Sequence, residues 1–314
     1  MAAAVISPFI TYFHFTMILI ADSGSTKTDW ALSTGAADGS LELFATQGIN
    51  PVHQSEDCIS GIIASELMAR PTADVTTNGS QAPSPTVDAA TVSEVHFYGA
   101  GCSAERAPLV AQVLRRFFPS AVVTVSSDML GAARAVLGRS EGIACILGTG
   151  ANSCLYDGEK IVGNTPALGY ILGDEGSGAV LGRLFVNAIF KNPAFSSLRD
   201  EFLAEQNMQM ADVIDRVYRQ PMANRFLASA SLFIGRRIGN PLLSDLVVGN
   251  FRSFFRCNIV PYGRRDLPIG FVGSMACHYR QQLCEAAAAE GFVVGRILQK
   301  PLNDIVKYHV KSGE

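Results

Sequence analysis

The sequence predicts an α/β protein built from two duplicated domains. Each half opens with three short apolar runs of strand type, at residues 17–22, 29–33 and 41–47, and again at 143–147, 153–156 and 159–162. In both halves the first run ends in a polar turn that contains glycine, and helical patterns and further strands follow. The repeat is one of element order rather than of sequence identity.

The first half continues with alternating helices and strands. Apolar side chains recur at helical spacing over residues 55–70 and 105–118, which predicts two helices. The runs 94–98 and 121–126 predict two strands, with a helix from about Met129. Residues 71–91 are rich in proline and polar side chains, which is typical of a surface loop.

The second half contains a hairpin and a long helical segment. Asp157 and Gly158 lie between the two strands of the predicted hairpin. Helical patterns then run from about residue 176 to residue 255, with breaks expected near Pro193, Pro221 and Pro241. The remaining predicted elements are a strand, a helix, a strand and a final helix, at 269–272, 275–290, 292–298 and 302–310.

These patterns predict a first domain over residues 17–135 and a second over 136–314. The final helix is a candidate to return to the first domain. Residues 1–16 are expected to be an appendage, because the buried-strand pattern begins only at Met17 and no Lys or Arg precedes the earlier apolar residues.

Composition argues for a small-molecule partner. The chain has 314 residues, of which 48% are hydrophobic and 17% charged, and its net charge is −3. No basic stripe or long apolar span suggests a nucleic acid or a membrane as partner. The seven cysteines form no C-x-x-C pair, so we expect buried thiols in a reducing cytoplasm. The sequence leaves the oligomeric state open, a homodimer included.

The first chemical motif directly follows the first strand. Its expected phosphate-binding residues are Asp22, Gly24, Ser25, Thr26, Lys27 and Thr28. A tight turn, with positive φ at the glycine, would direct backbone N–H groups and hydroxyls toward a phosphate, and Asp22 can hold a hydrated Mg²⁺. The alternative is an ordinary hairpin turn rich in small polar residues.

The second motif occupies the equivalent position in the second half. It comprises Gly148, Thr149, Gly150 and Asn152. Two such turns in a duplicated chain are expected to face each other across a cleft and hold one triphosphate between them. The P-loop pattern and the three-glycine dinucleotide pattern are both absent.

Asp128 is the candidate catalytic residue. It stands where the fifth strand ends and a helix begins. There it could accept the proton of an attacking hydroxyl, as a general base does in phosphoryl transfer. The alternative is a helix N-cap without a catalytic role.

Further polar turns at strand ends point to a substrate. Residues 169–178 contain Gly169 and Asp174 among several glycines, and carboxylates suit sugar hydroxyls. The alternative for this segment is helix capping. Asn50 and Gly101 end the third and fourth strands, and ligands favour the carboxyl ends of strands in α/β sheets.

Taken together, these residues resemble a known group. Residues 22–29, Asp128, residues 148–153, residues 173–177, and Gly273 with Ser274 are similar to the N-acetylglucosamine kinase type. That type belongs to the activator ATPases of benzoyl-CoA reductase and 2-hydroxyacyl-CoA dehydratase, within the superfamily of sugar kinases, actin and heat-shock chaperone ATPases. The resemblance extends from Met17 to the C-terminus.

The resemblance implies two ribonuclease-H-like domains with a hinged cleft and the cofactors ATP and Mg²⁺. By the same resemblance, Gly273 and Ser274 match the adenosine segment, Asp128 matches the catalytic base, and Asn50 and Asp174 match sugar ligands. The implied product is a sugar 6-phosphate.

Three matters stay open at this stage. Residues 165–170 depart from the glycine- and tryptophan-rich stretch of animal N-acetylglucosamine kinases. N-acetylmuramate, glucosamine or an anhydro sugar therefore remain alternatives to N-acetylglucosamine.

A reductase-activating ATPase would need cysteine ligands for an iron–sulfur cluster, for which Cys102 with Cys145 or Cys154 are the candidates. A regulator that binds nucleotide or sugar without catalysis is the third reading.

Overall fold

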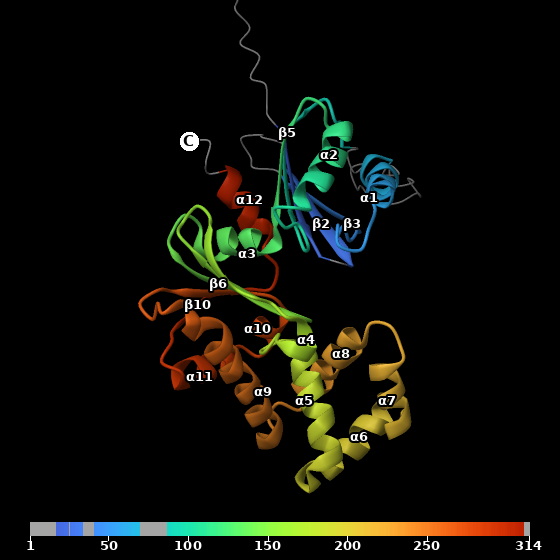
Figure 1. Cartoon of the computed structure of the whole chain (residues 1–314), viewed down its shortest axis with the longest axis vertical. Helices are drawn as coiled ribbons and strands as arrows, with labels where there is room; N and C mark the ends of the chain where they lie inside the picture. Colours follow the sequence, from blue (N-terminus) through green and yellow to red (C-terminus); the bar gives the residue numbers. More distant parts are fainter. Residues whose placement is uncertain (1–16, 25, 34–40, 70–86, 311–314) are drawn as a thin grey trace, which may run out of the picture. The chain divides into compact units, whose positions relative to one another are not determined.

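A computed structural model describes residues 17–24, 26–33, 41–69 and 87–310 (Figure 1). The expected appendage 1–16 and residues 71–86 of the expected loop lie outside this part of the chain. The chain divides into two compact units between Ser126 and Ser127. The expected boundary after residue 135 lies inside a helix that packs on the second sheet.

The first unit is built on a mixed five-stranded sheet in the order β3-β2-β1-β4-β5. The strands are β1 (Met17–Ser23), β2 (Lys27–Ser33), β3 (Leu41–Gln47), β4 (Val92–Gly99) and β5 (Val122–Ser127). β2 is antiparallel to both β1 and β3, and β1 is parallel to β4. The carboxyl ends of β1, β3 and β4 therefore share one edge of the sheet.

Two helical segments cover one face of this sheet in Figure 1. They are α1 (Glu56–Ile62), which continues as a π-helical turn (Ile63–Met68), and α2 (Ala107–Phe117). Their apolar residues pack with Trp30 and Phe97 into one core. Burial of these large side chains gives the unit most of its stabilisation.

The second unit repeats the same topology in the order β8-β7-β6-β9-β10. Its strands are β6 (Gly142–Leu147), β7 (Ala151–Tyr156), β8 (Ile161–Thr165), β9 (Ile269–Val272) and β10 (Val294–Leu298). β7 is antiparallel to β6 and β8, and β9 is parallel to β6 and β10. The shared strand order confirms the predicted duplication.

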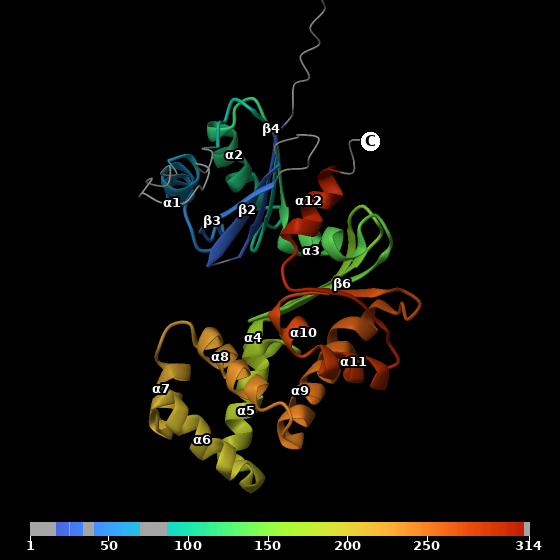
Figure 2. The ribbon, with the colours of Figure 1, turned by 180° about the vertical axis from the view of Figure 1, so that it is seen from behind.

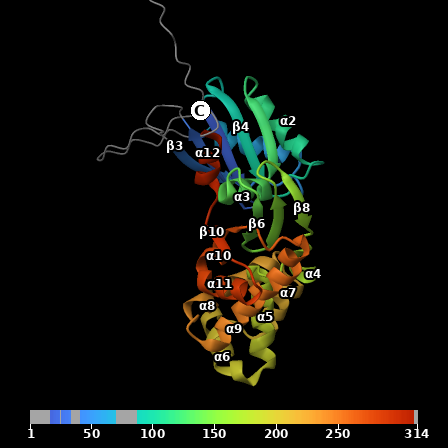
Figure 3. The same ribbon diagram turned by 90° about the vertical axis from the view of Figure 1, so that its left-hand side faces the viewer.

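Helices cover both faces of the second sheet (Figures 2 and 3). On one face lie α3 (Asp128–Leu137) and α12 (Leu302–Val310), and α3 packs closely enough that a Cβ on Gly270 would lie 2.4 Å from Val136. The other face carries α5 (Gly178–Lys191), α9 (Pro241–Phe254) and α11 (Arg280–Ala289), whose apolar side chains belong to the larger core.

The long helical segment lies between β8 and β9. Besides α5 and α9 it contains α4 (Gly169–Leu172), α6 (Ser196–Gln206), α7 (Met210–Tyr218) and α8 (Ala223–Arg236). The breaks near Pro193, Pro221 and Pro241 are confirmed, and a further break occurs where Asn207 adopts a left-handed conformation. The four-residue helix α4 was not predicted.

The prediction of one continuous helix after β9 was wrong. Residues 275–290 form two helices, α10 (Ser274–His278) and α11, separated at Tyr279. The Tyr279 ring is buried, and its hydroxyl donates to the carbonyl of Ser231 at 2.5 Å. A tertiary contact thus accompanies a break that helical spacing alone does not show.

Candidate functional site

In the first unit, the candidate residues gather at the shared carboxyl edge of β1, β3 and β4. Asp22 is the penultimate residue of β1 and pairs with Tyr98 of β4. Asn50 follows β3, and Gly101 follows β4. The structure therefore brings together three residues that lie far apart in the sequence.

Ser23 links these three strand ends, a role that was not predicted from the sequence. Its buried hydroxyl donates to the carbonyl of Ile49 at 2.9 Å and accepts from the Ile49 N–H at 3.0 Å. Its own carbonyl accepts from the Ala100 N–H at 2.8 Å. The turn that carries Asn50 and the turn that carries Gly101 are thus both tied to the end of β1.

Asn50 and Gly101 touch each other directly. Gly101 has a φ of 77°, and a Cβ at this position would lie 2.3 Å from Asn50 Oδ1. That oxygen also accepts the Val52 N–H at 2.9 Å. Glycine is required here because no other residue leaves room for the Asn50 amide.

The turn after β1 differs from the expectation at its glycine. Gly24 donates its N–H to the Lys27 carbonyl at 2.9 Å, but its φ is not positive, and a Cβ would meet only that carbonyl oxygen at 3.7 Å. The predicted left-handed glycine is therefore wrong. Thr26 and Lys27 are exposed, whereas Ser25 lies outside the described residues.

Thr28 also departs from the expectation. Its side chain is fully buried, and its hydroxyl donates to the Gln47 carbonyl at 3.0 Å and lies 2.7 Å from the Ser23 hydroxyl. The predicted donation from this hydroxyl to a phosphate is wrong, because the hydroxyl holds the hairpin together. Lys27 forms an ion pair with Asp29 at 2.6 Å.

In the second unit, the equivalent turn between β6 and β7 is fixed by the start of α5. The carbonyls of Gly148 and Thr149 accept the N–H groups of Gly178 and Ala179 at 2.8 and 3.1 Å. The side chain of Thr149 is exposed, and a Cβ on Gly148 would meet no atom within 4 Å. One side of this turn is therefore open to a ligand.

Asn152 extends the same turn. Its Oδ1 accepts the Ser153 N–H at 2.9 Å and the Asn164 amide at 3.0 Å. These bonds orient the side chain toward β8, so Asn152 fixes the loop through its oxygen.

Asp174 lies directly against this turn. A Cβ on Gly150 would be 3.0 Å from Asp174 Oδ2, so glycine leaves the carboxylate its place. Desolvation by burial raises the pKa of Asp174, and hydrogen bonds from the backbone N–H groups of Gly169 and Ala151 oppose that rise. The backbone of Asp174 is left-handed, with a φ of 55°. Strain of this kind in a non-glycine residue is often found at binding sites.

A buried amide holds the turn that carries Asp174. Asn250 on α9 accepts the Gly176 N–H at 3.0 Å and donates to the Ser177 carbonyl at 3.2 Å. Ser177 in turn caps α5 by accepting the Val180 N–H. Sequence reasoning missed Asn250, because its partners lie more than seventy residues earlier.

Asp128 is the first residue of α3 and directly follows β5. The N-cap is Ser127, whose hydroxyl accepts the Leu130 N–H, so capping alone does not account for Asp128. Desolvation by burial raises the pKa of the Asp128 carboxyl, although its Oδ1 accepts the Met129 N–H at 2.9 Å. A carboxylate with a raised pKa is a stronger base than an ordinary aspartate.

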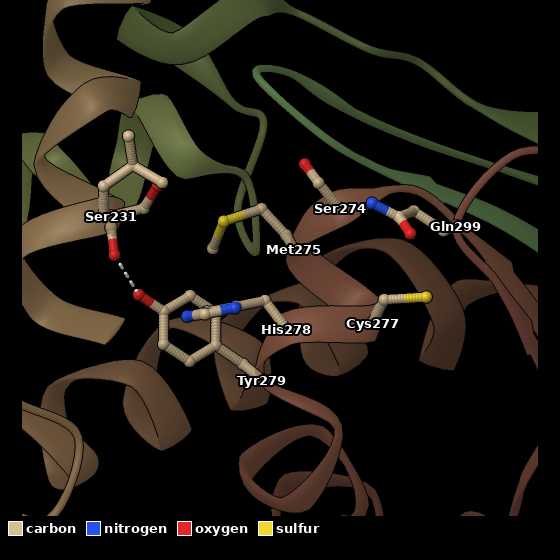
Figure 4. A pocket seen from close by; sticks show the side chains of 8 residues that line it. Ser231, Ser274, Met275, Cys277, His278, Tyr279 and Gln299 are labelled. Carbon is tan, nitrogen blue, oxygen red and sulfur yellow. Dashed lines mark hydrogen bonds between the residues drawn. The ribbon is translucent and has the colours of Figure 1, made fainter. Parts of the chain in front are cut away.

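A pocket of about 390 Å³ adjoins Ser274 (Figure 4). It is lined by both polar and apolar side chains from α8, α10 and the end of β10: Ser231, Leu232, Ser274, Met275, Cys277, His278, Tyr279 and Gln299. Gly273, directly before it, has a φ of 123°, and a Cβ there would lie 2.3 Å from the Leu147 carbonyl oxygen. Glycine thus lets β9 turn tightly past the end of β6 toward this pocket.

The cysteines only partly match the expectation. Cys102, Cys145 and Cys154 are buried, but Cys58, Cys257 and Cys284 are exposed and Cys277 is partly exposed, so the prediction of burial was wrong for these four. Desolvation raises the pKa of Cys154 to about 12 and that of Cys145 well above its ordinary value.

Among the described residues no group of three or more His, Cys, Asp or Glu could hold a metal, and no helix there could cross a membrane.

Comparison with solved structures decides the family. A structure from Porphyromonas gingivalis, named a putative N-acetylglucosamine kinase, matches with 43% sequence identity and a TM-score of 0.85, over 95% of this chain and 100% of that one. The chain belongs to this N-acetylglucosamine kinase family. No protein-family model and no curated protein matched.

More distant matches share the fold of this kinase family. A structure from Chromobacterium violaceum, also named a putative N-acetylglucosamine kinase, has 18% identity and a TM-score of 0.64, over 94% and 99% of the two chains. A ROK family glucokinase from Streptomyces griseus, in complex with glucose and AMPPNP, has 12% identity and a TM-score of 0.54, over 93% and 97%. These matches show the shared two-domain α/β fold, as the sequence predicted. Membership of the reductase-activator family stays a prediction.

Proposed function

We propose that this protein is an ATP-dependent kinase that phosphorylates an amino sugar, with N-acetylglucosamine as the substrate and its 6-phosphate as the product. The observation that carries the proposal is the match to the Porphyromonas gingivalis protein over the full length of that chain. The placement of Asp174 against the Gly148–Gly150 turn supports it, because a sugar ligand and a phosphate turn are then neighbours.

Sugar binding is assigned to residues of both units. Asp174 would accept hydrogen bonds from sugar hydroxyls, and the open left-handed turn at Gly169 would let the backbone approach the ring. Asn50, held against Gly101, would contribute from the first unit.

ATP binding is assigned to the two turns and the pocket beside Ser274. Gly24 and Thr26 in the first turn and Gly148 to Gly150 in the second would hold the phosphates. A Cβ added at Gly24 would come no closer than 3.7 Å to another atom, and one at Gly148 would meet nothing within 4 Å. The space beside both glycines is therefore open to a ligand. The pocket beside Ser274, at about 390 Å³, is of a size that suits an adenosine group.

Mg²⁺ is the implied metal, and the residues present fit it. Asp22 lies near the end of β1 and is partly exposed. A Mg²⁺ ion usually keeps several of its waters and needs only one or two protein carboxylates, so this single carboxylate suits it. The ion would neutralise charge on the phosphates.

Asp128 is assigned as the general base. Its carboxylate would take the proton from the attacking sugar hydroxyl as that oxygen bonds to the γ-phosphorus and the bond to the bridging β,γ-oxygen breaks. The desolvation that raises its pKa makes this transfer more favourable.

A coupled assay of ADP release with a panel of sugars tests the function. We expect the highest kcat/KM with N-acetylglucosamine, and lower values with glucosamine, N-acetylmannosamine, N-acetylmuramate and glucose. ³¹P NMR of the product would show whether the 6-hydroxyl carries the phosphate. No ADP release with any sugar, despite sugar and ATP binding, would instead support a non-catalytic regulator.

The iron–sulfur alternative has little support from the buried thiols. Cys145 and Cys154 lie buried within β6 and β7, and burial of this kind is typical of a structural thiol rather than of a cluster ligand. Iron and sulfide analysis of anaerobically purified protein tests it, and a stoichiometric cluster would overturn the kinase assignment.

A further inference from the structure

A second polar pocket lies between α3 and α12, on the face of the second sheet opposite α9 and α11. Its volume is about 400 Å³. Arg134, Arg139, Arg296 and Lys307 line it together with Asp304, and we call it the basic pocket. Figures 1 and 2 show the two helices side by side.

Positive charge dominates this pocket. Four of its lining side chains are cationic and one is acidic, which leaves an excess of three positive charges in a chain whose net charge is −3. Asp304 accepts from both Arg296, at 2.9 Å, and Lys307, at 3.2 Å. One carboxylate therefore serves two cations, and the field in the pocket favours an anion.

An aromatic ring holds Arg134 of α3 and Arg139, which lies just beyond the end of that helix. The guanidinium carbons of Arg134 and Arg139 lie 4.9 and 4.7 Å from the centre of the Tyr308 ring. Cation–π contacts of this length restrict the side chains before any ligand arrives. Arg296 is held as well, because it donates to the Ala135 carbonyl at 3.1 Å.

We propose that the basic pocket binds the phosphate group of a small phosphorylated compound. Guanidinium groups present several N–H donors in a planar fork that matches phosphate oxygens. The volume of about 400 Å³ is within the usual range for small-molecule sites. None of its residues belongs to the proposed kinase site, so this inference does not rest on the proposed function.

A bound anion would also contact the helix that carries the proposed base. Asp128 begins α3, and Arg134 lies in its last turn, with Arg139 just beyond its end.

Isothermal titration calorimetry at low ionic strength tests the proposal, with inorganic phosphate and glucose 1-phosphate as probes. The test protein is the full chain with Arg139→Gln and Lys307→Gln, both at exposed or largely exposed side chains. The control is Lys191→Gln with Arg219→Gln, which removes the same charge from exposed positions outside the pocket. Thermal melts of each protein establish that the fold is intact.

We expect the wild type and the control to bind both probes, glucose 1-phosphate the more tightly because its sugar fills more of the pocket. The pocket variant should bind at least about tenfold more weakly, since each lost charge-assisted hydrogen bond is worth about that factor. Equal affinities in the pocket variant and the control would overturn the proposal, as would the absence of binding to the wild type. A single substitution, Lys307→Glu, gives an independent check by reversing one charge.

Discussion

Removing the Asn250 amide should destabilise the second unit and weaken sugar binding. The variant Asn250→Ala leaves the buried Gly176 N–H without its partner, whereas the Ser177 carbonyl keeps the bond from the Leu181 N–H. An unsatisfied buried polar group costs about 1–3 kcal/mol of unfolding free energy. Because the same turn carries Asp174, we also expect the KM for the sugar to rise.

Urea denaturation and steady-state kinetics measure the two effects. Ser253→Ala on the same helix is a matched control, because it removes only the bond from the Ser253 hydroxyl to the Gly249 carbonyl and should change stability by less than about 0.5 kcal/mol. If Asn250→Ala lost less than about 1 kcal/mol and kept its KM for the sugar, the positioning role argued for Asn250 would be refuted.

Three further substitutions probe the assigned residues. Asp128→Asn should lower turnover by a factor of about 10²–10⁴ while ATP still binds. In the wild type, kcat/KM should fall as the pH drops through the raised pKa of Asp128, and the variant should not show this fall. ADP release measured across a range of pH tests both expectations. Gly150→Ala would place a Cβ 3.0 Å from Asp174 Oδ2, so the KM for the sugar should rise several-fold with little change in melting temperature. Gly273→Ala should cost more than the about 1–3 kcal/mol of backbone strain alone, because its Cβ would lie 2.3 Å from the Leu147 carbonyl, and a thermal melt measures this.

The outcomes that would contradict these three predictions are distinct. Near wild-type turnover in Asp128→Asn would remove its role as base. The control for both glycine variants is Gly249→Ala on α9, where a Cβ meets nothing within 4 Å and helix propensity predicts a gain of about 0.5–1 kcal/mol. If Gly150→Ala or Gly273→Ala behaved like this control, the close approaches described for them would not matter in solution.

Stability should also respond to the charge on Asp128. Its pKa is raised in the folded state, so between the unfolded and the folded pKa the native protein binds the extra proton. Stability contributed by this group therefore increases as pH falls through the folded pKa.

Local patterns predicted the order of the elements along the chain because most strands are short apolar runs. The runs at residues 41–47 and 269–272 coincide with β3 and β9, and a proline follows the ends of α5, α7 and α8. The break at Tyr279 was not predicted, because it coincides with a contact to Ser231 on another helix and leaves no trace in spacing.

The candidate site, like the fold, could be predicted only where local sequence patterns mark it. Strand ends indicated Asp22 and Asn50, and the glycine-rich turn before α5 indicated Asp174, because such polar turns are visible in the sequence. The inward orientation of Thr28 and the supporting bonds of Ser23 were not, since both depend on cross-strand pairing. Residue type alone cannot distinguish a hydroxyl that faces a ligand from one that holds a hairpin.

The helices from α4 to α9 are all inserted in one connection along the chain, between β8 and β9. The second sheet nevertheless has the same strand order as the first sheet. Asp174 lies near the beginning of that inserted stretch, whereas the phosphate turn lies outside it. Because the first residues of α5 hold the turn between β6 and β7 and α8 lines the pocket beside Ser274, a change to these helices would alter the proposed sugar and nucleotide sites together.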